Sequence, residues 1–148
     1  MGPQDTILSL SLHHPTRDLA VVCAALGLAP RPIWKAGDER QTPTGRKIGG
    51  FRDSSYCSIE LGIRSREPLS EKFDAALVLL RPHRAILREL SSEGGRVTFY
   101  IGWFCDEHTG DLLPWKLLEE MSDLRIELEF NIYIPDQRAS SGERMSEA

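Results

Sequence analysis

Apolar and polar residues alternate along four segments of the chain, which is the pattern of a β-strand with one buried and one polar face. The clearest example lies near the C-terminus, where apolar residues occupy every second position from Leu124 to Ile134. The same alternation runs through residues 8–13, 56–63 and 96–105. A short additional strand is expected at 33–35. The pattern therefore predicts a sheet built mainly from two-faced strands.

Helical spacing of apolar residues appears between these strands. It predicts a helix over 19–26 and a longer helical segment over 70–93. Pro82 interrupts the longer segment, because proline removes a backbone hydrogen bond and clashes with the preceding turn, so two pieces are expected. A short helix should follow Pro114, since proline is favoured in the first turn.

The order strand, turn, helix and strand occurs twice, at 7–36 and at 96–134. Two such β-α-β halves in one sheet are typical of ferredoxin-like folds. The strand at 56–63 and the broken helix would then be inserted between the halves. We therefore predict an α+β fold with a mainly antiparallel sheet and helices packed on it. Residues 1–135 should form a single domain, and the polar residues 136–148 a disordered tail.

Charge and cysteine content narrow the functional classes. The chain has 148 residues and a formal net charge of −4, whereas nucleic-acid-binding proteins usually carry a basic excess. Its three cysteines are odd in number and widely spaced, which argues against a disulfide framework. We expect no secretory leader, and the longest apolar run, 75–80, is too short for a membrane span. The sequence therefore predicts a cytoplasmic protein without nucleic-acid or membrane partners.

Short motifs such as Leu26-Gly27-Leu28-Ala29-Pro30 after the first helix and Asn131-Ile132-Tyr133 near the end of the last strand resemble a bacterial family of domains of unknown function, numbered 4279. The resemblance covers most of residues 6–134 and implies no known activity, so no catalytic residues are carried over. Tyr56 stands where the family leads us to expect a tryptophan. The matching pieces are Leu26-Gly27-Leu28-Ala29-Pro30, Lys35-Ala36-Gly37-Asp38, the strand at 54–61, the broken helix before Arg96, and the closing strand with Asn131-Ile132-Tyr133 near its end.

No arrangement of reactive residues predicts a metal, a cofactor or a nucleophile. Cys105 begins a C-x-x-H motif, but a structural zinc ion needs about four ligands. Antiparallel strands would place His13 near Arg96, at the opposite end of the sheet from Cys105. Cys23 and Cys57 fall on apolar stripes, where cysteine behaves as a small inert hydrophobe.

The segment 36–53 is predicted to be a long basic loop, because it is rich in glycine and poor in apolar residues. From Arg31 to Asp53, six basic residues outweigh three acidic ones, giving +3. Arg46 and Lys47 lie near the middle of the loop, which lacks the residue order of a phosphate-binding loop. The segment is either a solvated loop, or a site for an anion or a partner's acidic surface.

The polar faces of the strands are the main candidate site. If helices cover one side of the sheet only, these faces form one open surface that mixes tyrosines, hydroxyls and carboxylates. Tyrosine suits interfaces because it buries a large ring and keeps a polar end. The predicted binding residues are His13, Tyr56, Tyr100, Glu127, Glu129 and Tyr133, together with Arg46 and Lys47 of the loop; Ser9, Ser11, Ser58, Glu60, Thr98, Phe104 and Arg125 complete the polar surface.

The first functional hypothesis is a non-enzymatic binding or protein-interaction module. It would use this surface for an unidentified protein or small-molecule partner, or to join two copies in a homodimer. An immunity-type protein that neutralises a toxin is one version. The alternative is a small enzyme with a site built from His13, Tyr100, Glu127 and Glu129. A flat exposed face favours the binding module, and a pocket with a carboxylate in hydrogen-bond reach of His13 favours the enzyme.

Overall fold

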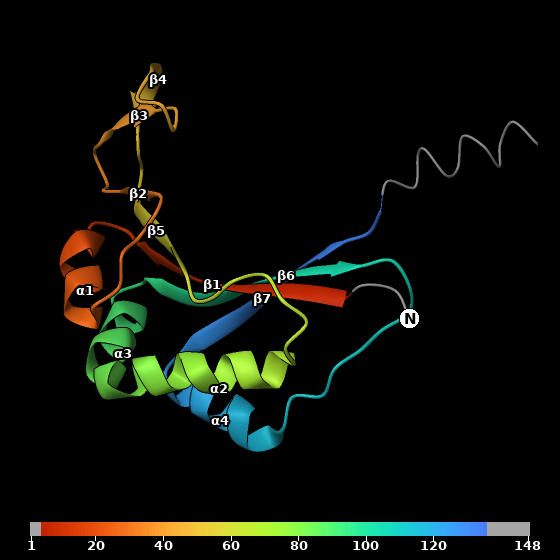
Figure 1. Ribbon diagram of the computed structural model, residues 1–148. Coiled ribbons are helices and arrows are strands. Elements are labelled where there is room, and N and C mark those ends of the chain that lie inside the picture. Colours follow the sequence, from red (N-terminus) through yellow and green to blue (C-terminus); the bar gives the residue numbers. More distant parts are fainter. Residues whose placement is uncertain (1–3, 136–148) are drawn as a thin grey trace, which may run out of the picture.

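The computed structural model describes residues 4–135 (Figure 1). The tail predicted to be disordered, 136–148, lies outside the described residues. The main sheet has five strands in the order β2-β5-β1-β6-β7, and β3 and β4 form a separate two-stranded sheet. In chain order the elements are β1 (Gln4–His14), α1 (Leu19–Leu26), β2 (Ile33–Trp34), β3 (Glu39–Gln41), β4 (Lys47–Phe51), β5 (Ser55–Glu60), α2 (Leu69–Leu80), the 3₁₀ turn η1 (Arg81–His83), α3 (Arg84–Ser92), β6 (Arg96–Cys105), α4 (Trp115–Asp123) and β7 (Ile126–Tyr133).

β1 is the central strand of the main sheet. It pairs antiparallel with β5 on one side and with β6 on the other. β6 and β7 are parallel neighbours joined through α4, which makes a β-α-β unit. The α+β class with a mainly antiparallel sheet is therefore confirmed. The strand order nevertheless differs from a ferredoxin-like sheet, in which each β-α-β half is split by a strand, because α4 returns the chain to the position directly beside β6.

The hydrophobic core lies on one side of the main sheet, where all four α-helices pack (Figure 1). Leu8, Leu10 and Leu12 of β1 point to this side and are at most 2% exposed. Phe73 of α2 stacks on Phe99 of β6 with ring centroids 5.4 Å apart. No helix in the range 4–135 is both long enough and apolar enough to cross a membrane.

The predicted break at Pro82 is confirmed, because the proline lies in the short turn η1 between α2 and α3. Two details near the last strand were predicted wrongly. The strand starts at Ile126, since Leu124 caps α4 and Arg125 has a left-handed backbone with φ 61°. Arg125 therefore lies in the turn before β7 and not on its polar face. Leu118 of α4 is 42% exposed.

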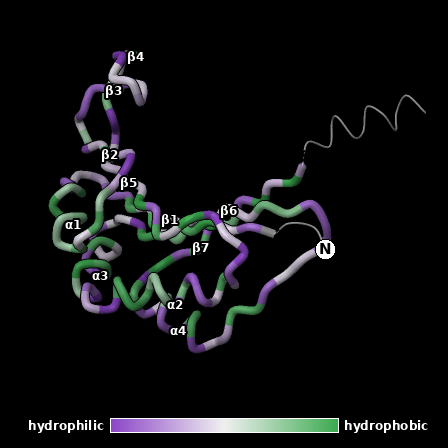
Figure 2. Tube along the Cα trace, in the orientation of Figure 1, coloured by the Kyte–Doolittle hydropathy of each residue, from purple (hydrophilic) through white to green (hydrophobic). Residues whose placement is uncertain are grey.

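The segment predicted as one long loop contains the β3–β4 hairpin. The hairpin stands away from the main sheet in Figure 1, and its trace in Figure 2 is mainly white to purple, the colours of intermediate and hydrophilic residues. Every residue of β3 and β4 is exposed. The backbone pairing of Glu39 with Phe51 and of Gln41 with Lys47 defines these strands, and in the turn between them Thr42 N–H donates to the Arg46 carbonyl at 2.8 Å. Because no apolar face is involved, the sequence gives no alternation from which to predict them.

Candidate functional site

The side of the main sheet that faces away from the described helices is an exposed surface, hereafter the open face. The strand register places His13 between Tyr56 and Arg96, and Tyr100 beside Glu129. The six residues predicted for the sheet, from His13 to Tyr133, are therefore brought together on this face. In full, the open face comprises Trp34 (β2), Tyr56, Ser58 and Glu60 (β5), Asp5, Ile7, Ser9, Ser11 and His13 (β1), Arg96, Thr98, Tyr100, Gly102 and Phe104 (β6), and Glu127, Glu129, Asn131 and Tyr133 (β7).

An aromatic row occupies the β2 end of the open face. The ring of Tyr56 lies 4.6 Å from that of His13 and 4.9 Å from that of Trp34, measured between centroids. The guanidinium of Arg52 lies over the Trp34 ring, 3.7 Å from its centroid. Burial, and then the nearby charge of Arg96, lower the pKa of His13, so its imidazole is neutral at pH 7. No pattern in the sequence predicted the contact of Trp34 with Tyr56, because that contact depends on how β2 pairs with β5.

A second aromatic group lies at the β7 end. The hydroxyls of Tyr100 and Tyr133 are 2.5 Å apart, and the ring of Tyr133 stacks on Phe104 at 4.8 Å. The guanidinium of Arg64 lies 3.7 Å above Phe104. The hydrogen bond with Tyr133 and partial burial raise the pKa of Tyr100 to about 12, with a smaller contribution from the negative charge of Glu129. Tyr100 therefore remains a neutral hydroxyl at pH 7.

The two glutamates that β7 contributes to the open face already have polar partners. Arg96 Nε donates to a carboxylate oxygen of Glu127 at 2.9 Å, and the side-chain amide of Asn131 donates to Glu129 at 3.0 Å. The ion pair raises the pKa of Arg96, mainly through its hydrogen bond to Glu127. His13 contacts Tyr56 through its ring. In the described contacts, Glu127 and Glu129 therefore interact with neighbouring side chains of the polar surface, and neither contacts His13.

Arg46 and Lys47, the two predicted binding residues of the loop, lie in the β3–β4 hairpin and not on the open face. They are at the turn of the hairpin, exposed to solvent, and Lys47 Nζ lies 3.3 Å from a carboxylate oxygen of Glu39. Beside the hairpin is a groove of about 670 Å³. Its lining mixes Trp34 and Arg52 with the acidic Asp38 and Glu39, so the groove is not uniformly basic. The structure therefore does not join the two basic residues to the open face.

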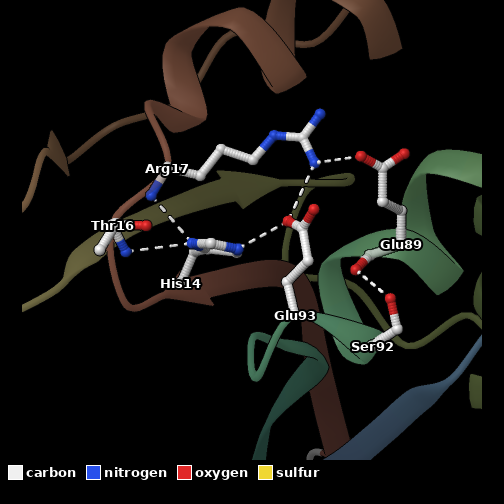
Figure 3. Close-up of polar contacts among 6 residues, drawn as sticks. All are labelled: His14, Thr16, Arg17, Glu89, Ser92 and Glu93. Atoms are coloured by element: carbon white, nitrogen blue, oxygen red, sulfur yellow. Dashed lines mark hydrogen bonds and ion pairs between the residues drawn. The ribbon is translucent and has the colours of Figure 1, made fainter.

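A buried histidine that sequence reasoning passed over organises the turn after β1 (Figure 3). His14 is 5% exposed, and its Nδ1 accepts backbone N–H bonds from Thr16 at 3.1 Å and Arg17 at 2.8 Å. Nε2 must therefore carry the proton, and it donates to Glu93 at 2.8 Å. Arg17 also pairs with Glu89 and Glu93. His14 thus fixes the start of α1 to the end of α3.

The cysteines divide into a buried pair and one separate thiol. The sulfurs of Cys23 and Cys57 lie 3.5 Å apart in the core, and this contact, followed by burial, raises the pKa of the Cys57 thiol. Cys105 pairs with Gln4, and His13 with Arg96, so Cys105 and His13 lie at opposite ends of the sheet, as predicted. Within the part of the chain that the structure describes, no group of three His, Cys, Asp or Glu side chains is placed to hold a metal ion.

These features define a class of protein: an α+β domain with one helix-covered side and one exposed, tyrosine-bearing side. The sequence model of the family described as "Domain of unknown function (DUF4279)" matches residues 4–135, so the chain belongs to that family. The predicted family membership is thereby confirmed. Neither the curated proteins nor the solved structures contain a match.

Proposed function

We propose that this chain is a non-enzymatic protein-binding module whose open face contacts a partner protein. The observation that carries the proposal is the pair of aromatic clusters on the face, one built from Trp34, Tyr56 and His13 and the other from Tyr100, Phe104 and Tyr133. Between them, strand pairing places the hydroxyls of Ser58, Ser11 and Thr98 side by side. Tyrosine and tryptophan contribute large contact areas at interfaces while their polar ends form hydrogen bonds. These side chains project from paired strands and touch their neighbours within each cluster. Binding would therefore lose little side-chain conformational entropy.

The charge on the open face supports a partner with a neutral to weakly basic surface. Arg96 is paired with Glu127, and at the β7 end Arg64 is paired with Asp5 at 3.1 Å. His13 is neutral at pH 7 because its pKa is lowered. Glu60 and Glu129 remain exposed near the middle of the face, beside Ser9 and Tyr100. A partner surface with hydroxyl, amide and a few basic groups would match this pattern, whereas a nucleic acid would not.

The contacts of the carboxylates favour binding over acid–base catalysis. A general base needs a free carboxylate or imidazole within hydrogen-bond reach of the reacting proton. Glu127 and Glu129 accept hydrogen bonds from Arg96 and Asn131 instead. We further propose a cytoplasmic location, which is supported by the three free cysteines within residues 4–135.

The test compares a variant of the open face with a variant of the helical side. Tyr56→Ala combined with Tyr100→Ala removes two rings from the face, and Val78→Ala is the control because Val78 is 60% exposed on α2. Each purified protein is used to retain partners from an extract of the native host, identified by mass spectrometry. Affinity for the purified partner is then measured by titration calorimetry. We expect the double variant to bind at least about tenfold more weakly, and the control to bind like the unmodified chain. Unchanged affinity of a folded double variant would refute the proposal, as would loss of binding in the control.

A further inference from the structure

β7 is an edge strand. Its inner side pairs with β6 along eight positions, and no strand within 4–135 pairs with its outer side. An edge strand exposes a row of backbone N–H and C=O groups that can pair with another chain. Proteins usually protect such edges with short strands, prolines or inward-pointing charges. β7 is eight residues long, and between its first and last residues it contains neither proline nor an inward-pointing charge.

The side chains that β7 directs toward the helical side become more exposed along the strand. Ile126 is 7% exposed, Leu128 is half-buried, Phe130 is 42% exposed and Ile132 is 62% exposed. Ile134, just after the strand, is 60% exposed. These residues share the face that is buried elsewhere in the sheet. An apolar row therefore continues beyond the part of β7 that α4 covers.

A groove of mixed polarity lies beside the start of the same edge. It has a volume of about 460 Å³, and its lining combines the apolar Leu118, Met121, Ile126 and Leu128 with polar residues: Ser91, Arg96, Ser122, Arg125 and Glu127. Leu118 contributes a side chain that is 42% exposed. One end of β7 thus offers a groove with four apolar side chains in its lining, and the other end offers exposed isoleucines. If β7 of a second copy ran antiparallel to β7 of the first, the isoleucines of each copy would lie beside the groove of the other.

We propose that β7 of one copy pairs antiparallel with β7 of a second copy about a twofold axis at Phe130, so that the two main sheets become continuous. In this register Phe130 faces its counterpart, Leu128 faces Ile132, and Ile126 faces Ile134. The exposed isoleucines of each copy then lie over the groove of the other. On the opposite side of the sheet, Glu127 faces Tyr133, and Glu129 faces Asn131. Every apolar side chain meets an apolar one, and each carboxylate meets a neutral hydrogen-bond donor.

Other positions of the twofold axis along β7 would also keep the helices of both copies on one side of the joined sheet. The charges that face each other and the length of strand that overlaps favour the axis at Phe130. An axis at Leu128 would oppose Glu127 to Glu129, and an axis at Glu129 would oppose that residue to itself. Like charges directly opposite each other destabilise a strand pair. An axis at Asn131 avoids this repulsion but moves Ile126 out of the overlap, so that the groove loses its isoleucine neighbour. The edge of β7 therefore complements a second copy of itself in both charge and apolar contact, which is a stronger argument for pairing than its exposure alone.

This inference is independent of the proposed function, because it concerns the edge of the sheet and not the open face. The pairing would place the open faces of the two copies side by side on one continuous sheet. In a twofold dimer the β7 edge of each copy is paired with the β7 edge of the other. No β7 edge remains free to bind a third copy, so pairing stops at two copies. The assembly of the chain can therefore be tested without knowledge of any other partner.

The first experiment measures mass by sedimentation equilibrium up to about 100 µM, a range that detects micromolar association. We expect the unmodified chain to be dimeric. Ile132→Lys places a cation on the apolar side of the edge and should raise the dissociation constant at least about tenfold. Val78→Lys is the matched control, since Val78 is 60% exposed and Ile132 is 62% exposed; it should leave the dimer intact. Melting curves establish that both variants fold.

The second experiment tests the register. In a Cys105→Ser background, Phe130→Cys brings two thiols opposite each other across the axis, within the Cα separation that a disulfide requires. Exchange with oxidised glutathione should cross-link Phe130→Cys efficiently, and Glu129→Cys only slightly. A monomeric unmodified chain would overturn the proposal, as would a dimer that survives Ile132→Lys or cross-links better through position 129. Failure of either kind leaves the open-face test unaffected, because that test uses Tyr56 and Tyr100.

Discussion

Replacement of His14 should reveal how strongly the turn after β1 depends on one buried side chain. Its imidazole accepts two backbone N–H bonds, from Thr16 and Arg17, and donates a third hydrogen bond to Glu93. His14→Ala removes all three interactions. His14→Asn is a more selective change, because a side-chain carbonyl at this position can still accept N–H bonds from residues shortly after it in the chain. The asparagine is too short to reach Glu93.

The expected magnitudes follow from the number of hydrogen bonds that each variant loses. A typical intramolecular hydrogen bond contributes about 1 kcal/mol net to the free energy of unfolding. His14→Ala should therefore lower that free energy by about 3 kcal/mol, and His14→Asn by about 1 kcal/mol. Urea unfolding followed by circular dichroism measures both values, provided that the slope with denaturant is unchanged. If His14→Asn lowers the free energy of unfolding as much as His14→Ala does, the two bonds from the backbone N–H groups of Thr16 and Arg17 do not account for the stability that His14 provides. If neither variant is destabilised, the account of the turn is refuted.

The same network predicts a dependence on pH. The hydrogen bond from His14, followed by the charge of Arg17, holds the pKa of Glu93 below its usual value. A carboxyl whose pKa is lowered in the folded state contributes stability that is fully present above its unfolded pKa, about 4.3. That contribution is lost as the pH falls through the lower, folded-state value. The unmodified chain should consequently lose more stability between about pH 5 and pH 3 than Glu93→Gln does. Parallel curves for the two proteins would contradict this expectation.

Two further predictions concern packing and metals. A Cβ atom on Gly95 would lie 2.6 Å from the Leu90 carbonyl oxygen and 2.7 Å from that of His13, so Gly95→Ala should lower the free energy of unfolding by about 1–3 kcal/mol; Gly110→Ala, which meets nothing within 4 Å, should be neutral in the same urea titration. Because no metal-binding group occurs among the residues between 4 and 135, a chelator should leave the melting temperature unchanged, and a clear decrease would indicate a metal site.

Apart from Arg125, the sequence was sufficient to predict which of the named residues face the polar side of the sheet. Alternation on β1, β5, β6 and β7 assigned His13, Tyr56, Tyr100 and Glu129 to one side, and strand pairing brings them together. Alternation is informative here because one side of each strand is buried against helices. The hairpin has no buried side, and its strands were missed for that reason.

Contacts between distant parts of the chain could not be predicted in this way. His14 occupies a strand end, where the sequence indicates only a turn, and its partner Glu93 lies on α3. Trp34 joins the aromatic row because β2 pairs with β5, and Cys23 meets Cys57 because α1 packs over the same strand. Periodicity identifies the buried or exposed side of an element, whereas these contacts depend on strand order and helix placement.

The apolar alternation of β7 has a consequence that links the fold to the proposed assembly. Eight strand residues extend about 26 Å, whereas the nine residues of α4 span only about 14 Å. One helix therefore cannot cover the whole apolar side of the strand, and the exposure of Phe130 and Ile132 follows from this difference in length. An apolar row that extends beyond its own helix needs a second covering surface. In the proposed dimer, the antiparallel copy supplies that surface from the end of β7 where α4 and its groove lie.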